Sequence, residues 1–235
     1  MTLAMPHRSG IAVALLILLT CTPARAVPDA ASEPRPQEDV AAPAKDLESD
    51  PEVYLQLISR LQDKRLYFAS LAHLDAFDRR WPSNRRSTLL RADALRETGY
   101  LDQAAALYEG LQQGPLAAQA HHGLGLIASK KGDLNAALIA LSRANRLDPT
   151  NAAVLNDLGY TQIMLQQMAE AGFNLHKATE LDPKNTRAGA NLALFYLLDH
   201  KPAQAEGVMD WYQLPERQRK EINAKASELA TRITH

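Results

Sequence analysis

The chain of 235 residues lacks several features on which large classes of proteins depend. It has one cysteine, Cys21, so no disulfide can form within a single chain. Only 11 residues are glycine, while alanine and leucine are abundant, which favours packed helices over strands and tight turns. The net charge of −1 argues against a protein that binds nucleic acid by neutralising phosphates. Hydrophobic residues still make up 46% of the chain, enough for a sizeable core.

The sequence also lacks the short motifs that are characteristic of enzyme active sites. It contains no G-x-S-x-G, H-E-x-x-H, P-loop or C-x-x-C pattern. His121 and His122 are adjacent, but neighbours on a helix point about 100° apart and cannot share a metal ion on one face. We therefore expect no enzyme, no cofactor and no metal site.

Long apolar runs are missing except near the N-terminus. The run "IAVALLILL" (11–19) follows a basic start, is too short to span a bilayer, and precedes Ala24-Arg25-Ala26. This layout predicts a signal peptide over residues 1–26. Cys21 leaves two outcomes open, because Leu18-Leu19-Thr20-Cys21 is an imperfect lipobox: lipidation at Cys21, or cleavage after Ala26.

Residues 27–50 are rich in proline, alanine and acidic residues and have few large apolar side chains. Such a stretch cannot bury enough surface to offset the entropy of ordering, so it is predicted to be a disordered linker.

From residue 51 the pattern becomes helical and repetitive. "HHGLGLIASKKGDLNAALIALSRANRLDP" (121–149) and "LNDLGYTQIMLQQMAEAGFNLHKATELDP" (155–183) match at a spacing of 34 residues. Small residues, leucine and proline recur in step: Gly125 and Gly159, Ala137 and Ala171, Leu141 and Leu175, Ala144 and Ala178, Pro149 and Pro183. This period is typical of the tetratricopeptide repeat (TPR), in which small residues let two antiparallel helices approach each other and proline ends the second one.

The anchors define five units, 51–84, 85–117, 118–151, 152–185 and 186–219, followed by a charged helix over 216–233 that would cap the last repeat. We therefore predict an all-α fold for residues 51–235. It is a TPR solenoid of about five helix pairs plus a C-terminal capping helix.

Function is expected on the groove that the first helix of each repeat lines. In repeats four and five the groove positions are largely apolar, whereas in the first three repeats they are mostly polar or charged. The candidate partner-binding residues are Asn156, Tyr160, Ile163, Met164, Arg187, Asn191, Leu194 and Leu197. One interpretation is that an amphipathic helix or extended peptide of a partner binds there, with the asparagines contacting its backbone and Arg187 a carboxylate. The other is that the C-terminal helix folds back and fills the groove itself.

The stretch "LNDLGYTQIMLQQMAEAGFNLHKATELDPKNTRAGANLALFYLLDHKPAQAE" (155–206) resembles the TadD proteins of the tight-adherence (Flp) pilus assembly systems. The export signal and the cysteine near its end are similar as well. The resemblance implies a non-enzymatic, pilotin-like adaptor in the periplasm. Its groove would bind a C-terminal segment of the outer-membrane secretin and help to place or stabilise it. Lipidation at Cys21 would anchor it to the inner leaflet of the outer membrane. The alternative is a general periplasmic scaffold for envelope machinery.

Overall fold

The computed structural model describes residues 50–233, which all fall within one compact unit. The predicted signal peptide, Cys21 and the predicted linker up to residue 49 lie outside the described residues. The helices are α2 (Pro51–Asp63), α3 (Tyr67–Arg80), α4 (Arg85–Glu97), α5 (Leu101–Glu109), α6 (Ala117–Lys130), α7 (Leu134–Leu147), α8 (Ala152–Met164), α9 (Met168–Leu181), α10 (Thr186–Leu198), α11 (Pro202–Trp211) and α12 (Glu216–Ile233). No strand occurs among these residues, and none of their helices is long and apolar enough to cross a membrane.

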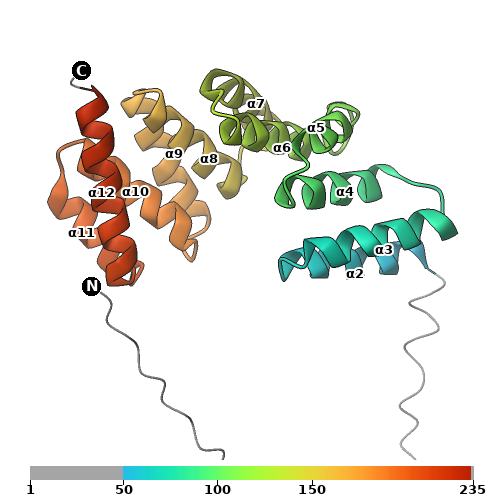
Figure 1. The fold of residues 1–235 in the computed structure, drawn as a ribbon. Coiled ribbons are helices and arrows are strands. Elements are labelled where there is room, and N and C mark those ends of the chain that lie inside the picture. Colours follow the sequence, from blue (N-terminus) through green and yellow to red (C-terminus); the bar gives the residue numbers. More distant parts are fainter. Residues whose placement is uncertain (1–49, 234–235) are drawn as a thin grey trace, which may run out of the picture. The chain divides into compact units, whose positions relative to one another are not determined.

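The helices from α2 to α11 pack mainly against their neighbours in the chain, whereas α12 packs against α10 (Figure 1). The first helices of the pairs, α2, α4, α6, α8 and α10, also contact one another in sequence, and we call them the first-helix row. The predicted fold class, an all-helical TPR-like solenoid, is confirmed. The cause is that one helix pair cannot bury its apolar face alone, whereas stacked pairs bury a continuous core.

Local signals set the helix ends. Asn151 and Asn185 accept hydrogen bonds from the backbone N–H groups of Val154 and Ala188, and so cap the starts of α8 and α10. The turn inside every pair contains one residue with a left-handed backbone. These residues are Arg65, Gly99, Gly132, Gln166 and His200. They stand at the same position in all five pairs, although only two of them are the glycines that this conformation favours.

The close approach of the helices depends on glycine, as the repeat pattern predicts. A Cβ atom on Gly159 would lie 2.7 Å from Cγ of Leu175, and one on Gly125 would lie 2.7 Å from Cγ of Leu141. Ala137 and Ala171 are fully buried. The apolar core is built within and between repeats, and the largest cluster joins repeats four and five to α12.

Candidate binding surfaces

A polar network occupies the first-helix row of α6, α8 and α10. Asp157 on α8 has a side chain that is only 5% exposed. Its Oδ2 lies 2.8 Å from Nε2 of His122, and its Oδ1 accepts a hydrogen bond from Arg187 at 2.5 Å. Nδ2 of Asn156 also donates to Asp157, and Nδ2 of Asn191 donates to Oδ1 of Asn156. A buried carboxylate needs such partners, so this network connects three consecutive repeats.

The network changes what is expected of the predicted polar residues. Asn156 is 2% exposed, and both ends of its amide are held by neighbours. Asn191 is half-buried. Of the three predicted polar residues, Arg187 is the most exposed, with 67% of its side chain accessible to solvent. Sequence analysis did not identify Asp157. The signal for it was an acidic residue that follows the groove asparagine on a helix otherwise rich in apolar residues.

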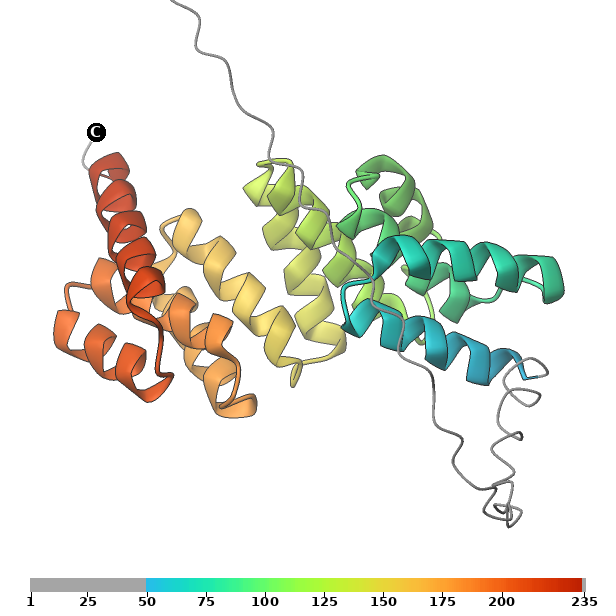
Figure 2. The same cartoon turned by 60° about the horizontal axis from the view of Figure 1, so that its bottom comes forward.

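The predicted apolar residues are covered rather than open. Ile163 and Leu194 are 3% and 4% exposed, so neither is open to a partner in the way that the first of the two interpretations requires. They belong to one buried cluster with Ile222, Ala226 and Leu229 of α12. Around this cluster pack the half-buried Tyr160, Met164 and Leu197. The physical reason is that α12 packs against α10 (Figure 2). The apolar side chains of α12 join the same core. The role of these residues toward a partner stays a prediction.

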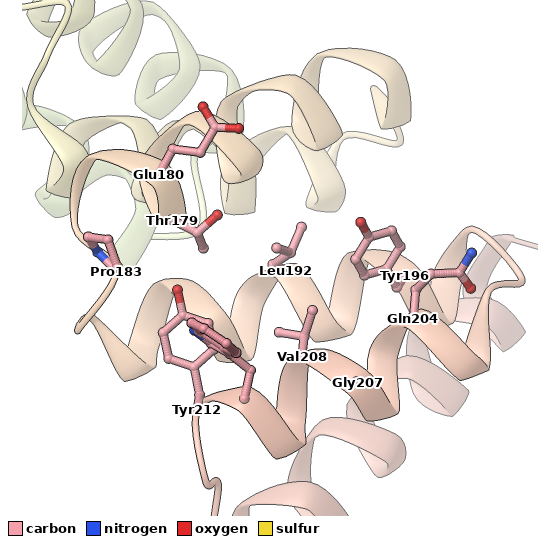
Figure 3. Close-up of a pocket in the computed structure, with 10 residues that line it drawn as sticks. Thr179, Glu180, Pro183, Leu192, Tyr196, Gln204, Gly207, Val208 and Tyr212 are labelled. Atoms are coloured by element: carbon pink, nitrogen blue, oxygen red, sulfur yellow. The ribbon is translucent and has the colours of Figure 1, made fainter.

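A second surface lies between α9, α10 and α11. It is a cavity of about 530 Å³ whose walls include Leu192, Tyr196, Val208 and Tyr212 (Figure 3). Trp211 also lines it and is 77% exposed, which is unusual for so large an aromatic side chain. An exposed apolar hollow of this kind is suited to holding an apolar side chain of another molecule. Sequence analysis missed it, because the repeat pattern is lost near these residues.

A second polar cluster joins α4 to α5. The hydroxyl of Tyr108 donates to Oδ1 of Asp93 at 2.6 Å and accepts a hydrogen bond from Nε of Arg96 at 3.2 Å. Burial raises the pKa of the Asp93 carboxyl above its ordinary value, and the Tyr108 hydroxyl and the Arg96 charge oppose that rise. Asp93 and Arg96 are groove positions of repeat two, so this part of the row is charged, as the sequence indicates.

None of these surfaces has the composition of a metal centre. Among residues 50–233, no group of three or more histidine, cysteine, aspartate or glutamate side chains could hold a metal ion.

Comparison with known proteins supports the repeat assignment. The family model described as tetratricopeptide repeat matches residues 118–151. A TPR repeat-containing protein of Pseudomonas aeruginosa is 33% identical over 136 residues, which cover 58% of this chain and 55% of that protein. The chain thus spans about half the length of this curated relative.

Solved structures agree with the fold. MamA from Desulfovibrio magneticus RS-1, residues 41 to the end, superposes with a TM-score of 0.54 at 18% identity, covering 71% of this chain and 95% of that one. A double mutant of MamA RS-1 gives a TM-score of 0.54 at 17% identity, covering 73% and 97%. The chain therefore has the fold of TPR solenoids, which are typically scaffolds for binding other proteins.

Proposed function

We propose that this protein is a non-enzymatic adaptor that binds an amphipathic helix of a protein partner on α8 and α10. The observation that carries the proposal is α12 itself. Its Ile222, Ala226 and Leu229 recur at helical spacing and share a buried cluster with Ile163 and Leu194. A surface that accepts one amphipathic helix of the chain has the shape and apolar character to accept another.

The strength with which α12 is held supports exchange with a partner. The two large side chains that α12 buries, Ile222 and Leu229, contribute together about 3–6 kcal/mol, and the entropy lost on ordering the helix offsets part of this. The docked α12 weakens the apparent affinity of a competing helix, because the partner binds only the fraction of molecules in which α12 has left the surface. A partner helix with larger apolar side chains can offset this penalty.

The start of α12 is tied to α11 by ion pairs. Arg219 forms ion pairs with Glu206 at 3.2 Å and with Asp210 at 2.7 Å, and its Nε donates to the carbonyl of Leu214. Residues Ile222 to Leu229 can then leave α10 while the start of the helix stays attached to α11. Tyr160 and Leu197 are half-buried at the border of the cluster and would be contacted by the incoming helix, with Arg187 available for a carboxylate.

The likeness of residues 155–206 to TadD supports a narrower form of the proposal. In this form the partner is a C-terminal segment of the tight-adherence pilus secretin, and the protein acts as a pilotin-like factor in the periplasm. Lipidation at Cys21 would place it at the inner leaflet of the outer membrane. If the partner is instead a component of other envelope machinery, the same surface serves a general periplasmic scaffold.

The test is a titration of the chain from residue 27 onward with labelled peptides from the C-terminal tail of the secretin of the same genome. Fluorescence anisotropy reports binding, and circular dichroism reports the fold. We expect saturable binding that weakens by about 1–3 kcal/mol on Tyr160→Ala, since central aromatic anchors contribute that much. The double variant Ile222→Ser with Leu229→Ser removes the competing face of α12 and should bind more tightly.

The matched control is Lys220→Ser with Glu221→Ser, which changes two exposed positions of the same helix. This control should leave the affinity unchanged. If neither the natural chain nor the Ile222/Leu229 variant binds any tail peptide at tens of micromolar while the helical signal is intact, the secretin is not the partner. If the gene for this protein also lies outside a pilus gene cluster, the general periplasmic scaffold is favoured.

A further inference from the structure

A composite pocket lies beside α6 and α7, apart from the residues used above. Two hollows share Gln112, His121 and Arg143. One, of about 370 Å³, has apolar walls that include Leu124, Ile127 and Ile139. The other, of about 360 Å³, is bordered by Gly114, Arg146 and Leu147. The space exists because α5 ends at Glu109 after nine residues, so the chain from 110 to 116 makes turns instead of continuing a helix.

The side chains around this pocket are left without partners. His121 is 8% exposed and lines both hollows, yet its ring has no hydrogen bond to any described residue. Arg143 and Arg146 form no ion pair with residues 50–233. The ring nitrogens of His121 are not fully buried, since the ring borders the two hollows, and the nearby charges of Arg143 and Arg146 have no carboxylate partner among residues 50–233. The hollows therefore have the charge to bind an anion.

The nearby acidic side chains do not supply that anion. Asp133 borders the apolar hollow, but its Oδ1 accepts the backbone N–H of Ala136 and so caps α7. Asp102 is held by Lys131 at 2.6 Å. The charges of Arg143 and Arg146 add to burial in lowering the pKa of His121, which is the direction expected where no carboxylate faces the ring.

The apolar walls restrict the kind of anion that fits. Ile139 and Leu147 are each 56% exposed on α7, beside the two arginines. A small inorganic anion would contact the two arginines and leave Ile139 and Leu147 exposed to water. A peptide with a carboxylate next to a large apolar side chain would contact both the arginines and the apolar walls.

We propose that this pocket, formed by His121, Arg143 and Arg146 with the apolar side chains of Leu124, Ile127 and Ile139, is a second peptide-binding site. It takes an acidic segment of a partner protein in which a carboxylate side chain adjoins a leucine-like side chain. The carboxylate lies between the two arginines, and the apolar side chain rests on the α6 and α7 walls. The protein then has two contact surfaces and can hold two segments together.

The test uses the chain from residue 27 onward and the labelled peptide acetyl-Gly-Glu-Leu-Asp-Leu-Gly-amide. The control peptide is the same sequence with Gln in place of Glu and Asn in place of Asp. We expect saturable binding of the acidic peptide only. Arg143→Gln with Arg146→Gln should weaken it by about tenfold or more, because charge-assisted hydrogen bonds are lost. Ile139→Ser should weaken it several-fold. All three changed side chains are exposed, so the fold should persist.

Lys184→Gln removes an exposed positive charge elsewhere and is the control, which should bind as the natural chain does. Tyr160→Ala should also leave this affinity unchanged, which separates the result from the function proposed above. The proposal is overturned if the acidic peptide does not bind, if binding survives loss of both arginines, or if inorganic phosphate or anionic lipid vesicles bind equally well and ignore Ile139→Ser.

Discussion

Tyr108→Phe is a sharp test of the buried polar packing in repeat two. Tyr108 is fully buried, and its ring fills the space beside Gly123, where a Cβ atom would lie 2.3 Å from the ring. Phenylalanine keeps that ring and removes only the oxygen. Asp93 then loses a donor at 2.6 Å, and Arg96 loses an acceptor for its Nε. The change therefore isolates one hydroxyl group.

The size of the effect follows from the charged partners. A hydrogen bond to a charged group contributes about 1.5–3 kcal/mol to stability. The Asp93 side chain is 34% exposed, so water replaces part of the lost bond. Arg96 also retains Glu97 at 2.5 Å. We expect the free energy of unfolding to fall by about 1–2 kcal/mol at neutral pH.

The pH dependence has a definite sign. Burial raises the folded-state pKa of Asp93 above its ordinary value, so its contribution to stability is present in acid and is lost as pH rises through the folded pKa. The Tyr108 hydroxyl lowers that pKa, so its removal raises the pKa further and extends the loss to higher pH. In acid the carboxyl is protonated in both proteins, and the difference between them should shrink.

The assay is urea unfolding followed by far-UV circular dichroism at about pH 4 and about pH 7. Tyr100→Phe is the control, because Tyr100 is 51% exposed and its hydroxyl has no hydrogen bond to a described residue. A Tyr108→Phe variant as stable as the natural chain at neutral pH, or less stable by the same amount at both pH values, would contradict this role of the hydroxyl.

Two further predictions follow from the repeat packing and the pocket. Gly159→Ala should lower the free energy of unfolding by about 1–3 kcal/mol, because the new Cβ atom would clash with Leu175. Gly207→Ala is the control, because its Cβ atom has open space, and it should raise the free energy of unfolding by up to about 1 kcal/mol. Chemical denaturation of the two variants measures both changes. Arg143→Gln should raise the pKa of His121, which burial and the two arginines lower. The stability lost as pH falls from the unfolded pKa of this histidine to its folded pKa should then become smaller. Proton NMR titration of the ring measures this, and an unchanged His121 pKa would contradict the electrostatic account.

Much of the fold could be predicted from the sequence because the repeat is local and redundant. Gly125 and Gly159 face Leu141 and Leu175 in the way that their spacing indicates. The left-handed turns at Arg65, Gln166 and His200 were harder, since no glycine marks them. There the packing of the two helices forces a backbone that the side chain itself disfavours.

The candidate site was less predictable. The sequence left open whether a partner or the C-terminal helix covers Ile163 and Leu194, and in the structure both are buried. Their burial depends on the apolar residues of α12, which follow Leu194 by about thirty residues and Ile163 by about sixty residues. His121 is buried, and only the structure reveals the two arginines from α7 beside it.

The sequence by itself determined the period, the helix pairs and the small residues that let them touch, because each repeat carries its own packing pattern and its neighbours need only match it. The tertiary structure alone decided which apolar face is covered, which polar groups meet in the Asp157 network, and where His121 is left without a partner. These features depend on contacts between residues of different repeats, whose positions are set only when the whole stack is assembled.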